Sequence, residues 1–598
     1  MHIRFFLACW IFFIPPSIQA QAPSYPRGYF RNPLNLPMNL VANFGELRTN
    51  HWHMGLDIRT NHQVNQPVYA AADGYVARIR VEPLGFGQAI FINHPNGLTT
   101  VYGHLNQFFP ALAQYVREQQ YARSSWPLEL EFQPDQFPVR KGQFIAYSGN
   151  AGASQGPHLH FEIRDTRTTR CLNPLLFGLP VPDPVAPTIT RLALYDRSRS
   201  VYGQSPRLVP LEHSSGNYHI KGGSPVRTGW RKLSFAIGAF DRLGGSANPV
   251  GIYQARVWVD SRLVSGFTLD SIDYTETRDV NAQIDYPYHA RTGIYLQHLS
   301  PLPGDNCRVY DRVAGEGVLV LEDQAIHQVR IEVLDAYLNH ATLQFSLRYD
   351  PSQAAPEPGS GEGGQVTLTP NYVNVWERPD FEAYLPEGAI YDTVRTVYQR
   401  FDAQEPAAAS ARHVFGDPAI PVHGEFTVRL QARPGLPDAW RDRLVIRCQA
   451  GGRTVMRKAS WENGWIMARF NGFGEFQAFG DLEPPLLPAP GQGDTLDFSG
   501  RFALVLTPSD RFGVASLQAE LDGRWLLFTN DKGRSWVYRF DERCPYGIHQ
   551  LRVRVRDLAG NETVRTWWFR RYAHAASRPH APQKPRGSHH KPVHRKHR

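Results

Sequence analysis

Short β-rich runs of apolar residues, bounded by turn residues, recur along this chain, which predicts β-strands and few helices. The stretch AIFINHPNGLTTVYGHL, residues 89–105, holds two such runs joined by Pro-Asn-Gly, a strong hairpin signal. PALAQYVREQQYA, residues 110–122, departs from this pattern because Leu112, Tyr115 and Val116 would share one helical face. We therefore predict a mainly β chain with one short helix near residue 115.

An internal repeat organises the second half of the chain. IHQVRIEVLDAYLN (326–339) matches IHQLRVRVRDLAGN (548–561) at an offset of 222 residues, and FDRLGG (240–245) upstream of the first resembles SDRFGV (509–514) upstream of the second. Each copy predicts an alternating strand that ends in an Asp-x-x-x-Asn turn, as in a β-sandwich module. We expect the Asp and Asn to bond neighbouring backbone groups, with a calcium site as the alternative.

Proline, glycine and charge divide the rest of the chain. The predicted fold is an antiparallel β domain of the duplicated hybrid motif type, followed by three β-sandwich or Ig-like domains. The predicted segments are a signal peptide at 1–20, the first domain at 21–186 with an insertion at 106–138, an Ig-like sandwich at 187–350, a flexible linker at 351–365, a β-sandwich at 366–483, an Ig-like sandwich at 484–572 and a disordered tail at 573–598.

The first twenty residues have the pattern of an export signal. Arg4 precedes a run of apolar residues too short to span a bilayer, and two prolines and a small residue at Ala20 follow. A retained membrane anchor is the alternative. We expect an exported chain, periplasmic, envelope-associated or secreted, that does not span the membrane once the signal is removed. Four cysteines remain (Cys171, Cys307, Cys448 and Cys544), and they share no metal-type spacing.

Charge is concentrated at the C-terminus. The formal net charge is +9, and residues 573–598 contain four Arg, three Lys and no acidic residue. With almost no apolar side chains this tail cannot bury enough surface to fold, so a solvated disordered end is one interpretation. The other is attraction to an anionic envelope polymer. An exported chain is not expected to bind nucleic acid.

Histidines and one aspartate gather in two short segments. In NHWHMGLDI, His53 and Asp57 would stand ~13 Å apart in a straight strand, but Gly55 between them permits a sharp bend. In PHLHFEI, His158 and His160 are two apart in a predicted strand and point to the same side. A lone His-x-His strand is by default a pair of ordinary histidines, and only the fold can join segments a hundred residues apart.

The flanking residues add a family resemblance. NHWHMGLDI, VYAAADGYV, GFGQAIFINHPNGLTTVYGHL and VRKGQFIAYSGNAGASQGPHLHFEI occur in the order seen in lysostaphin-type (LytM-type) zinc endopeptidases, which the chain resembles over residues 40–178. The resemblance implies Zn²⁺ as cofactor, with His53, Asp57 and His160 as metal ligands. It implies that His104 and His158 handle the water and the developing oxyanion. The segment from Asn106 to Pro138 is longer than the family pattern, and we expect it to wall one side of the cleft.

Other residues near these motifs have two interpretations each. Glu162 either orients a ligand or forms a salt bridge, and Tyr102, two before His104, is expected to line the cleft. His51 is expected at the surface and His94 in a structural role. The glycines of residues 149–156 are expected to let a substrate backbone approach closely.

The substrate implied by the resemblance is the peptide part of peptidoglycan. We expect a zinc metalloendopeptidase that hydrolyses stem-peptide or cross-link amides. No HExxH helix occurs in the sequence, so a thermolysin-like glutamate base is not available. The alternatives are a non-catalytic regulator of other wall hydrolases, which would usually lack metal ligands, and a secreted β-sandwich adhesin.

Overall fold

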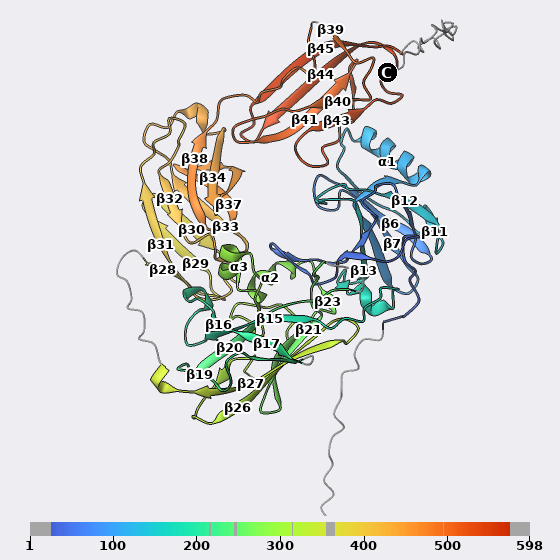
Figure 1. Ribbon diagram of the computed structural model, residues 1–598. Helices are drawn as coiled ribbons and strands as arrows, with labels where there is room; N and C mark the ends of the chain where they lie inside the picture. The colour runs from blue at the N-terminus through green and yellow to red at the C-terminus, as the bar shows by residue number, and fades with distance from the viewer. Residues whose placement is uncertain are drawn as a thin grey trace, which may run out of the picture.

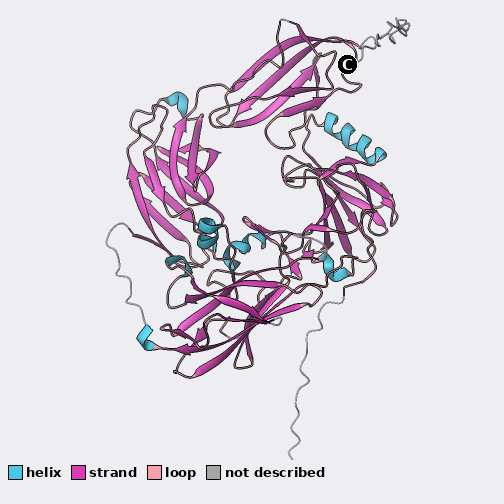
Figure 2. Ribbon diagram, in the orientation of Figure 1, coloured by secondary structure: helices cyan, strands magenta, loops and turns pink. Residues whose placement is uncertain are grey.

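The computed structural model describes residues 25–573, apart from 215–216, 244–247, 312, 314, 354–364 and 494. The predicted signal peptide at 1–20, most of the linker at 351–365 and nearly all of the tail at 573–598 therefore lie outside the described residues. Strands dominate the described chain and helices are few and short (Figure 2). The protein is mainly β, as predicted.

Four packed units follow one another around a ring, and the last unit comes back beside the first (Figure 1). Each unit has its own apolar core. No helix in the described part of the chain is both long enough and apolar enough to cross a membrane.

The first unit contains a large twisted sheet and a small one. Its elements are β1 (Leu40–Ala42), β2 (Leu47–Arg48), β3 (His51–Trp52), β4 (Leu56–Arg59), β5 (Pro67–Tyr69), β6 (Gly74–Val81), β7 (Gln88–Asn93), β8 (Leu98–Gly103), β9 (Leu105–Phe108), α1 (Pro110–Ala122), β10 (Leu128–Glu131), β11 (Pro138–Val139), β12 (Phe144–Ser148), β13 (His158–Asp165), β14 (Cys171–Leu172) and the 3-10 helix η1 (Pro174–Phe177). The large sheet has the order β1-β4-β13-β8-β7-β6-β10, and the small one β5-β12-β9. The predicted hairpin (β7–β8) and the predicted helix (α1) are both confirmed.

The second unit packs two sheets face to face. Its elements are β15 (Thr188–Asp196), η2 (Val201–Gly203), β16 (Arg207–Val209), β17 (Leu211–Ser214), β18 (Asn217–Ile220), β19 (Val226–Thr228), β20 (Lys232–Phe240), β21 (Gln254–Val259), β22 (Arg262–Thr268), β23 (Ser271–Ile272), η3 (Thr277–Asp279), α2 (Val280–Gln283), α3 (Tyr286–Thr292), β24 (Gln297–His298), β25 (Leu319–Val320), β26 (Ile326–Leu334), β27 (His340–Tyr349) and η4 (Pro351–Gln353). Alternate residues of β15 and β20 meet those of β26 and β27 in one core, as the period-two pattern predicts.

The third and fourth units are also built from two sheets each. The third contains β28 (Gln365–Leu368), β29 (Asn374–Arg378), β30 (Phe381–Leu385), β31 (Val394–Phe401), β32 (Arg412–Phe415), β33 (Pro421–Gln431), η5 (Asp438–Trp440), β34 (Leu444–Ala450), β35 (Arg453–Lys458), β36 (Ser460–Glu462), β37 (Trp465–Gly472) and β38 (Gly474–Gly480). The fourth contains β39 (Thr495–Asp497), β40 (Ala503–Leu506), β41 (Val514–Leu521), β42 (Arg524–Trp525), β43 (Trp536–Arg539), β44 (Gly547–Asp557) and β45 (Glu562–Arg571).

The first two units are joined by more than a linker. Strand β14 of the first unit pairs with β23 of the second, so the large sheet continues across the junction. The β2–β3 hairpin places Trp52 in the core of the second unit, where its Nε1–H donates to Gln283 Oε1 at 2.9 Å. Because Trp52 immediately precedes His53, this contact anchors the segment that carries the first candidate ligand.

Candidate metal centre

Strand register brings the candidate residues of the two sequence segments together. β13 lies between β4 and β8, and His160 is the register partner of both Asp57 on β4 and Gly103 on β8. His104 directly follows Gly103 and has a left-handed backbone (φ +56°). Three strands distant in sequence therefore present these side chains at one place on the sheet.

The turn before β4 adds the fourth residue. A Cβ at Gly55 would lie 2.5 Å from the Phe161 carbonyl oxygen and 2.9 Å from Glu162 Cγ, so only glycine allows this close approach to β13. The chain bends here, and His53 comes within hydrogen-bonding distance of Asp57. The bend that the sequence predicted at Gly55 is present, and lack of space for a side chain is the reason for the glycine.

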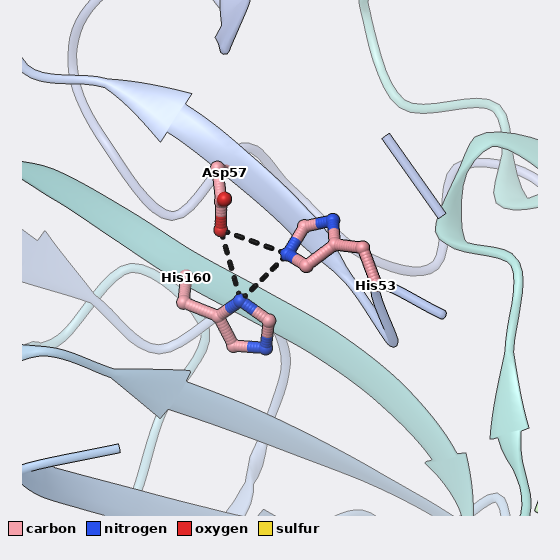
Figure 3. A group of neighbouring side chains, drawn as sticks. All are labelled: His53, Asp57 and His160. Atoms are coloured by element: carbon pink, nitrogen blue, oxygen red, sulfur yellow. Dashed lines mark hydrogen bonds and ion pairs between the residues drawn. The ribbon is translucent and has the colours of Figure 1, made fainter. Parts of the chain in front are cut away.

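His53, Asp57 and His160 form a tight buried triad (Figure 3). His53 Nε2 lies 3.0 Å and His160 Nδ1 2.9 Å from Asp57 Oδ1, and the two ring nitrogens are 3.1 Å apart. Each residue is 5% exposed. One atom from each side chain thus faces a common point from which water is largely excluded.

The outer hydrogen bonds assign the tautomers of the two rings. His53 Nδ1–H donates to the Asn43 carbonyl at 2.8 Å, and His160 Nε2–H donates to Glu162 Oε1 at 2.9 Å. In its neutral form each ring therefore turns a lone pair, not a proton, toward Asp57 Oδ1. With both rings neutral, three acceptors converge with no donor among them, which is the arrangement that a cation stabilises. Two imidazole nitrogens and one carboxylate oxygen are a donor set that fits zinc.

Burial and the close approach of the three side chains also shift the pKa values of the triad. Burial alone would raise the pKa of Asp57, but the charge of His53 and the close contacts with His158 and His160 hold it well below its usual range. Burial also lowers the pKa of His53. For His160 burial is outweighed by its bonds to Asp57 and Glu162, which raise the pKa to about 9. The triad therefore contains a fixed negative charge and favours a positive one, a proton or a metal ion, beside it.

Two further histidines reach the same cleft. His158 Nδ1–H donates to the Gly156 carbonyl at 2.8 Å, and its Nε2 lies 3.3 Å from Asp57 Oδ1. His104 Nδ1–H donates to the Ala151 carbonyl at 2.8 Å, and the two rings are 4.8 Å apart. Burial and the neighbouring histidines lower the pKa of His104 to about 3, so this ring is neutral near pH 7. Both rings present an Nε2 lone pair.

Glu162 both bonds a candidate metal ligand and forms a salt bridge, the two roles that the sequence left as alternatives. Oε1 accepts from His160, and Oε2 accepts from Arg164 Nε at 2.6 Å. Tyr274 Oη of the second unit also donates to Oε1, at 2.6 Å. No sequence signal connects Tyr274 with the site, because the contact depends on the junction between two units.

Replacing Tyr274 with phenylalanine is expected to weaken zinc binding about tenfold, within the roughly 10- to 100-fold range found for residues that support a metal ligand. The lost hydrogen bond leaves Glu162 freer to move and His160 less firmly oriented. Competition with a zinc chelator of known affinity measures this change. Tyr372→Phe, at a side chain 67% exposed in the third unit, is the control. Equal zinc affinity in both variants would contradict a supporting role for Tyr274.

Two charged residues before the triad also escaped prediction. Arg48 Nη2 donates to Asp57 Oδ2 at 3.0 Å, and Arg48 Nε donates to Glu46 Oε1 at 3.2 Å. Burial raises the pKa of Glu46 to about 7, although Arg48 opposes the shift. Arg48 thus engages the Asp57 oxygen that faces away from the histidines.

The candidate residues line a cleft of about 800 Å³. Its walls come from the β1–β4 segment, the loop around Phe86, residues 153–158 and Tyr274 with Thr277. No residue of the insertion 106–138 lines this cleft, so the expectation that it forms a wall is wrong. Helix α1 in that insertion instead contacts the fourth unit, where Tyr121 packs edge-on against Trp525.

Tyr102 does not line the cleft either, which corrects the second prediction for this strand. It is fully buried, its hydroxyl accepts the Ala71 N–H at 2.8 Å, and its ring packs against Phe161. The period-two rule fails between Tyr102 and His104 because the left-handed backbone at His104 turns the chain.

The other two histidines lie apart from the triad. His51 is exposed at the cleft rim, where its Nδ1 bonds the Thr49 carbonyl. His94 is buried between the Asp73 carbonyl and Thr100 Oγ1.

Loop 149–156 contains three glycines with different surroundings. A Cβ at Gly152 would lie 2.3 Å from the Gly87 nitrogen, and one at Gly149 would lie 2.7 Å from the His104 carbonyl oxygen. At Gly156 a Cβ would meet nothing within 4 Å. The close approach at Gly149 and Gly152 is to other parts of the same unit, not to the open cleft, which corrects the expectation for these two positions.

The fourth unit holds this loop from outside. Lys532 Nζ donates to the carbonyls of Asn150, Gly152 and Ser154 at 2.6–2.8 Å. Asp531 Oδ1 accepts the Gly152 N–H at 2.7 Å. The same loop supplies the Ala151 carbonyl that orients His104, so residues of the last unit support the cleft of the first.

Known proteins match two parts of the chain. Residues 51–122 match the model of peptidase family M23, and residues 365–481 match that of the Zu5-like domain. The first unit therefore carries an M23 peptidase domain. The third unit carries a Zu5-like domain, which the β-rich pattern of this segment did not indicate.

Curated relatives match less than a third of the chain. The DD-carboxypeptidase/endopeptidase Mpg of Neisseria meningitidis is 30% identical over 172 residues, 29% of this chain and 30% of its own length. The peptidoglycan DD-endopeptidase ShyA of Vibrio cholerae is 28% identical over 146 residues, 23% of this chain and 28% of its own length. The chain thus spans about a third or less of the length of these relatives.

Solved structures match over a similar share. A zinc-containing peptidase from Vibrio cholerae is 26% identical over 25% of this chain and 38% of that chain, with a TM-score of 0.17. The catalytic domain of lysostaphin from Staphylococcus simulans is 21% identical over 24% of this chain and 92% of that chain, with a TM-score of 0.18.

Proposed function

We propose that this protein is an exported, zinc-dependent endopeptidase that hydrolyses amide bonds in the peptide stems or cross-links of peptidoglycan. The observation that carries the proposal is the convergence of three acceptor atoms, from His53, Asp57 and His160, at the base of a cleft that two further histidines enter. The name of the relative ShyA, a peptidoglycan DD-endopeptidase, supports peptidoglycan as the substrate class, and a peptidoglycan substrate implies the cell envelope as the location.

His53, Asp57 and His160 are the proposed zinc ligands. When bound there, zinc supplies a Lewis acid that activates water and polarises the scissile carbonyl. Arg48 holds the second oxygen of Asp57, which leaves Oδ1 directed at the histidines. Glu162 fixes the His160 ring so that Nδ1 remains the ligand atom.

His158 and His104 are the proposed proton-transfer pair. Each has its Nδ1–H engaged by a backbone carbonyl, so each Nε2 is free to accept a proton from the attacking water. A ring that has taken up this proton becomes a donor. It can then stabilise the developing oxyanion or protonate the leaving amine.

Digestion of purified sacculi tests the proposed reaction. The purified chain is expected to release free amino groups and to free glycan strands from their cross-links without creating new reducing ends, because an amide and not a glycosidic bond breaks. A zinc chelator should stop the release, and stoichiometric zinc should restore it. New reducing ends, no release of amines, or release that persists after complete removal of zinc would each contradict the proposal.

A further inference from the structure

Two groups of aspartates, none of which lines the cleft, occupy matching places in the second and fourth units. The first carboxylate site contains Asp183, Asp241 and Asp335, and the second contains Asp481, Asp510 and Asp557. Within each site one oxygen of every carboxylate lies within 4.8 Å of the others. Residues around a single divalent cation have this spacing, since calcium binds oxygen ligands at about 2.3–2.6 Å.

Both sites are assembled from the same three structural positions. The first aspartate lies where the chain leaves the preceding unit: Asp183 follows η1, and Asp481 directly follows β38. The second belongs to the Asp-Arg pair of the repeat, Asp241 or Asp510. The third begins the Asp-x-x-x-Asn turn, before β27 in one unit and before β45 in the other. Each site therefore stands at a joint between consecutive units.

The Asp-x-x-x-Asn turns link each site to the segment that enters the sandwich. Asn339 Nδ2 donates to the Asp183 carbonyl at 3.0 Å and to Asp335 Oδ2 at 2.8 Å. Asn561 Nδ2 donates to the Asp481 carbonyl at 2.9 Å and to Asp557 Oδ2 at 2.8 Å. The turn thus bonds backbone groups, as predicted. Its Asn side chain also holds the aspartate of the incoming segment beside the aspartate that begins the turn.

Each site contains a deeply buried carboxylate with an unpartnered oxygen. Asp241 is 1% exposed, and its Oδ1 accepts no hydrogen bond. Asp481 is 5% exposed, and its Oδ2 accepts no hydrogen bond either. Asp183 Oδ2 in the first site is also unpartnered. An unsatisfied buried carboxylate is costly, so these oxygens indicate a missing positive partner.

The charges around the sites do not supply that partner. Burial raises the pKa of Asp241 to about 7, and the largest charge effects on it come from Asp183 and Asp335. Burial raises the pKa of Asp481 to about 6, and Asp510 and Asp557 add to the shift. In both sites like charges repel one another, and a cation would turn this repulsion into attraction.

We propose that each carboxylate site binds one divalent cation, with calcium preferred, and that the ion fixes the joint between one unit and the sandwich that follows. All candidate ligand atoms are oxygens, which suit calcium or magnesium and not zinc. Calcium is favoured because its flexible coordination of six to eight oxygens accepts carboxylates contributed by three separate segments, whereas magnesium requires near-ideal octahedral geometry.

Equilibrium dialysis with radioactive calcium on the zinc-saturated full chain tests the proposal. Wild type is expected to bind about two calcium ions per chain. Asp241→Asn and Asp481→Asn should each remove one, and the double variant both. Asp323→Asn, an exposed aspartate of the second unit, should leave the number unchanged. No binding at millimolar calcium, or two ions bound by the double variant, would overturn the proposal.

Thermal unfolding separates loss of a ligand from loss of the fold. Calcium should raise the melting temperature of wild type by several degrees and that of the double variant not at all. Without calcium the double variant should melt no lower than wild type, because amides relieve the repulsion. A double variant that melts lower than wild type without calcium would contradict the assignment of the carboxylate sites. An equal upward shift of the wild-type melting temperature with magnesium at the same concentration would contradict the preference for calcium.

Discussion

Replacing His160 with alanine is expected to leave less than about one-tenth of a zinc ion per chain, because the two remaining ligands bind the metal far more weakly than three. Cleavage of sacculi should fall by about a thousandfold or more, because loss of the metal removes several kcal/mol of transition-state stabilisation. Each 1.36 kcal/mol corresponds to about a tenfold change in rate. Elemental analysis and an amine-release assay on the same preparation measure both effects.

The matched control for this variant is His219→Ala. His219 is exposed on β18 of the second unit, far along the chain from the cleft. This variant should keep both zinc and turnover. If His160→Ala bound a full equivalent of zinc at the same affinity as the control, the proposed ligand set would be incorrect.

Replacing His158 with alanine is expected to separate zinc binding from turnover. The protein should keep most of its zinc, because His53, Asp57 and His160 remain with their outer hydrogen bonds. Turnover should fall roughly 100- to 10,000-fold, the usual cost of losing a group that transfers the proton. The loss should lie in kcat more than in KM, since this proton moves in the chemical step.

The pair of variants is more informative than either alone. His160→Ala loses metal and activity together, whereas His158→Ala loses activity alone. A His158→Ala protein that digests sacculi at the wild-type rate would remove this residue from the proposed chemistry and leave the metal assignment standing. Zinc loss equal to that of His160→Ala would instead place His158 among the ligands.

The sequence predicted the elements of the site because its signals are local. The two-residue spacing of His158 and His160 follows from strand geometry alone, and the glycine between His53 and Asp57 permits a bend. Hairpin β7–β8 and helix α1 were predicted from Asn-Gly and from helical spacing. The catalytic roles of these histidines remain predictions.

The failures come from positions where local rules do not apply. Tyr102 was placed in the cleft by strict alternation, which the left-handed backbone at His104 interrupts. The insertion 106–138 was expected to wall the cleft, but its helix α1 contacts the fourth unit instead. Nothing in the sequence indicates this contact between two units. Tyr274, Arg48 and Lys532 act across turns or units, and no spacing rule relates them to the triad.

The bonds from Lys532 to loop 149–156 connect residues about 380 positions apart, so they close the chain into a circuit. Such a closure depends on the angles at every joint between its two ends, because small rotations add along the intervening units. A change at a remote joint would therefore alter the distance that Lys532 must bridge to reach this loop. The geometry around His104 thus depends in part on the third and fourth units, none of whose described residues line the cleft.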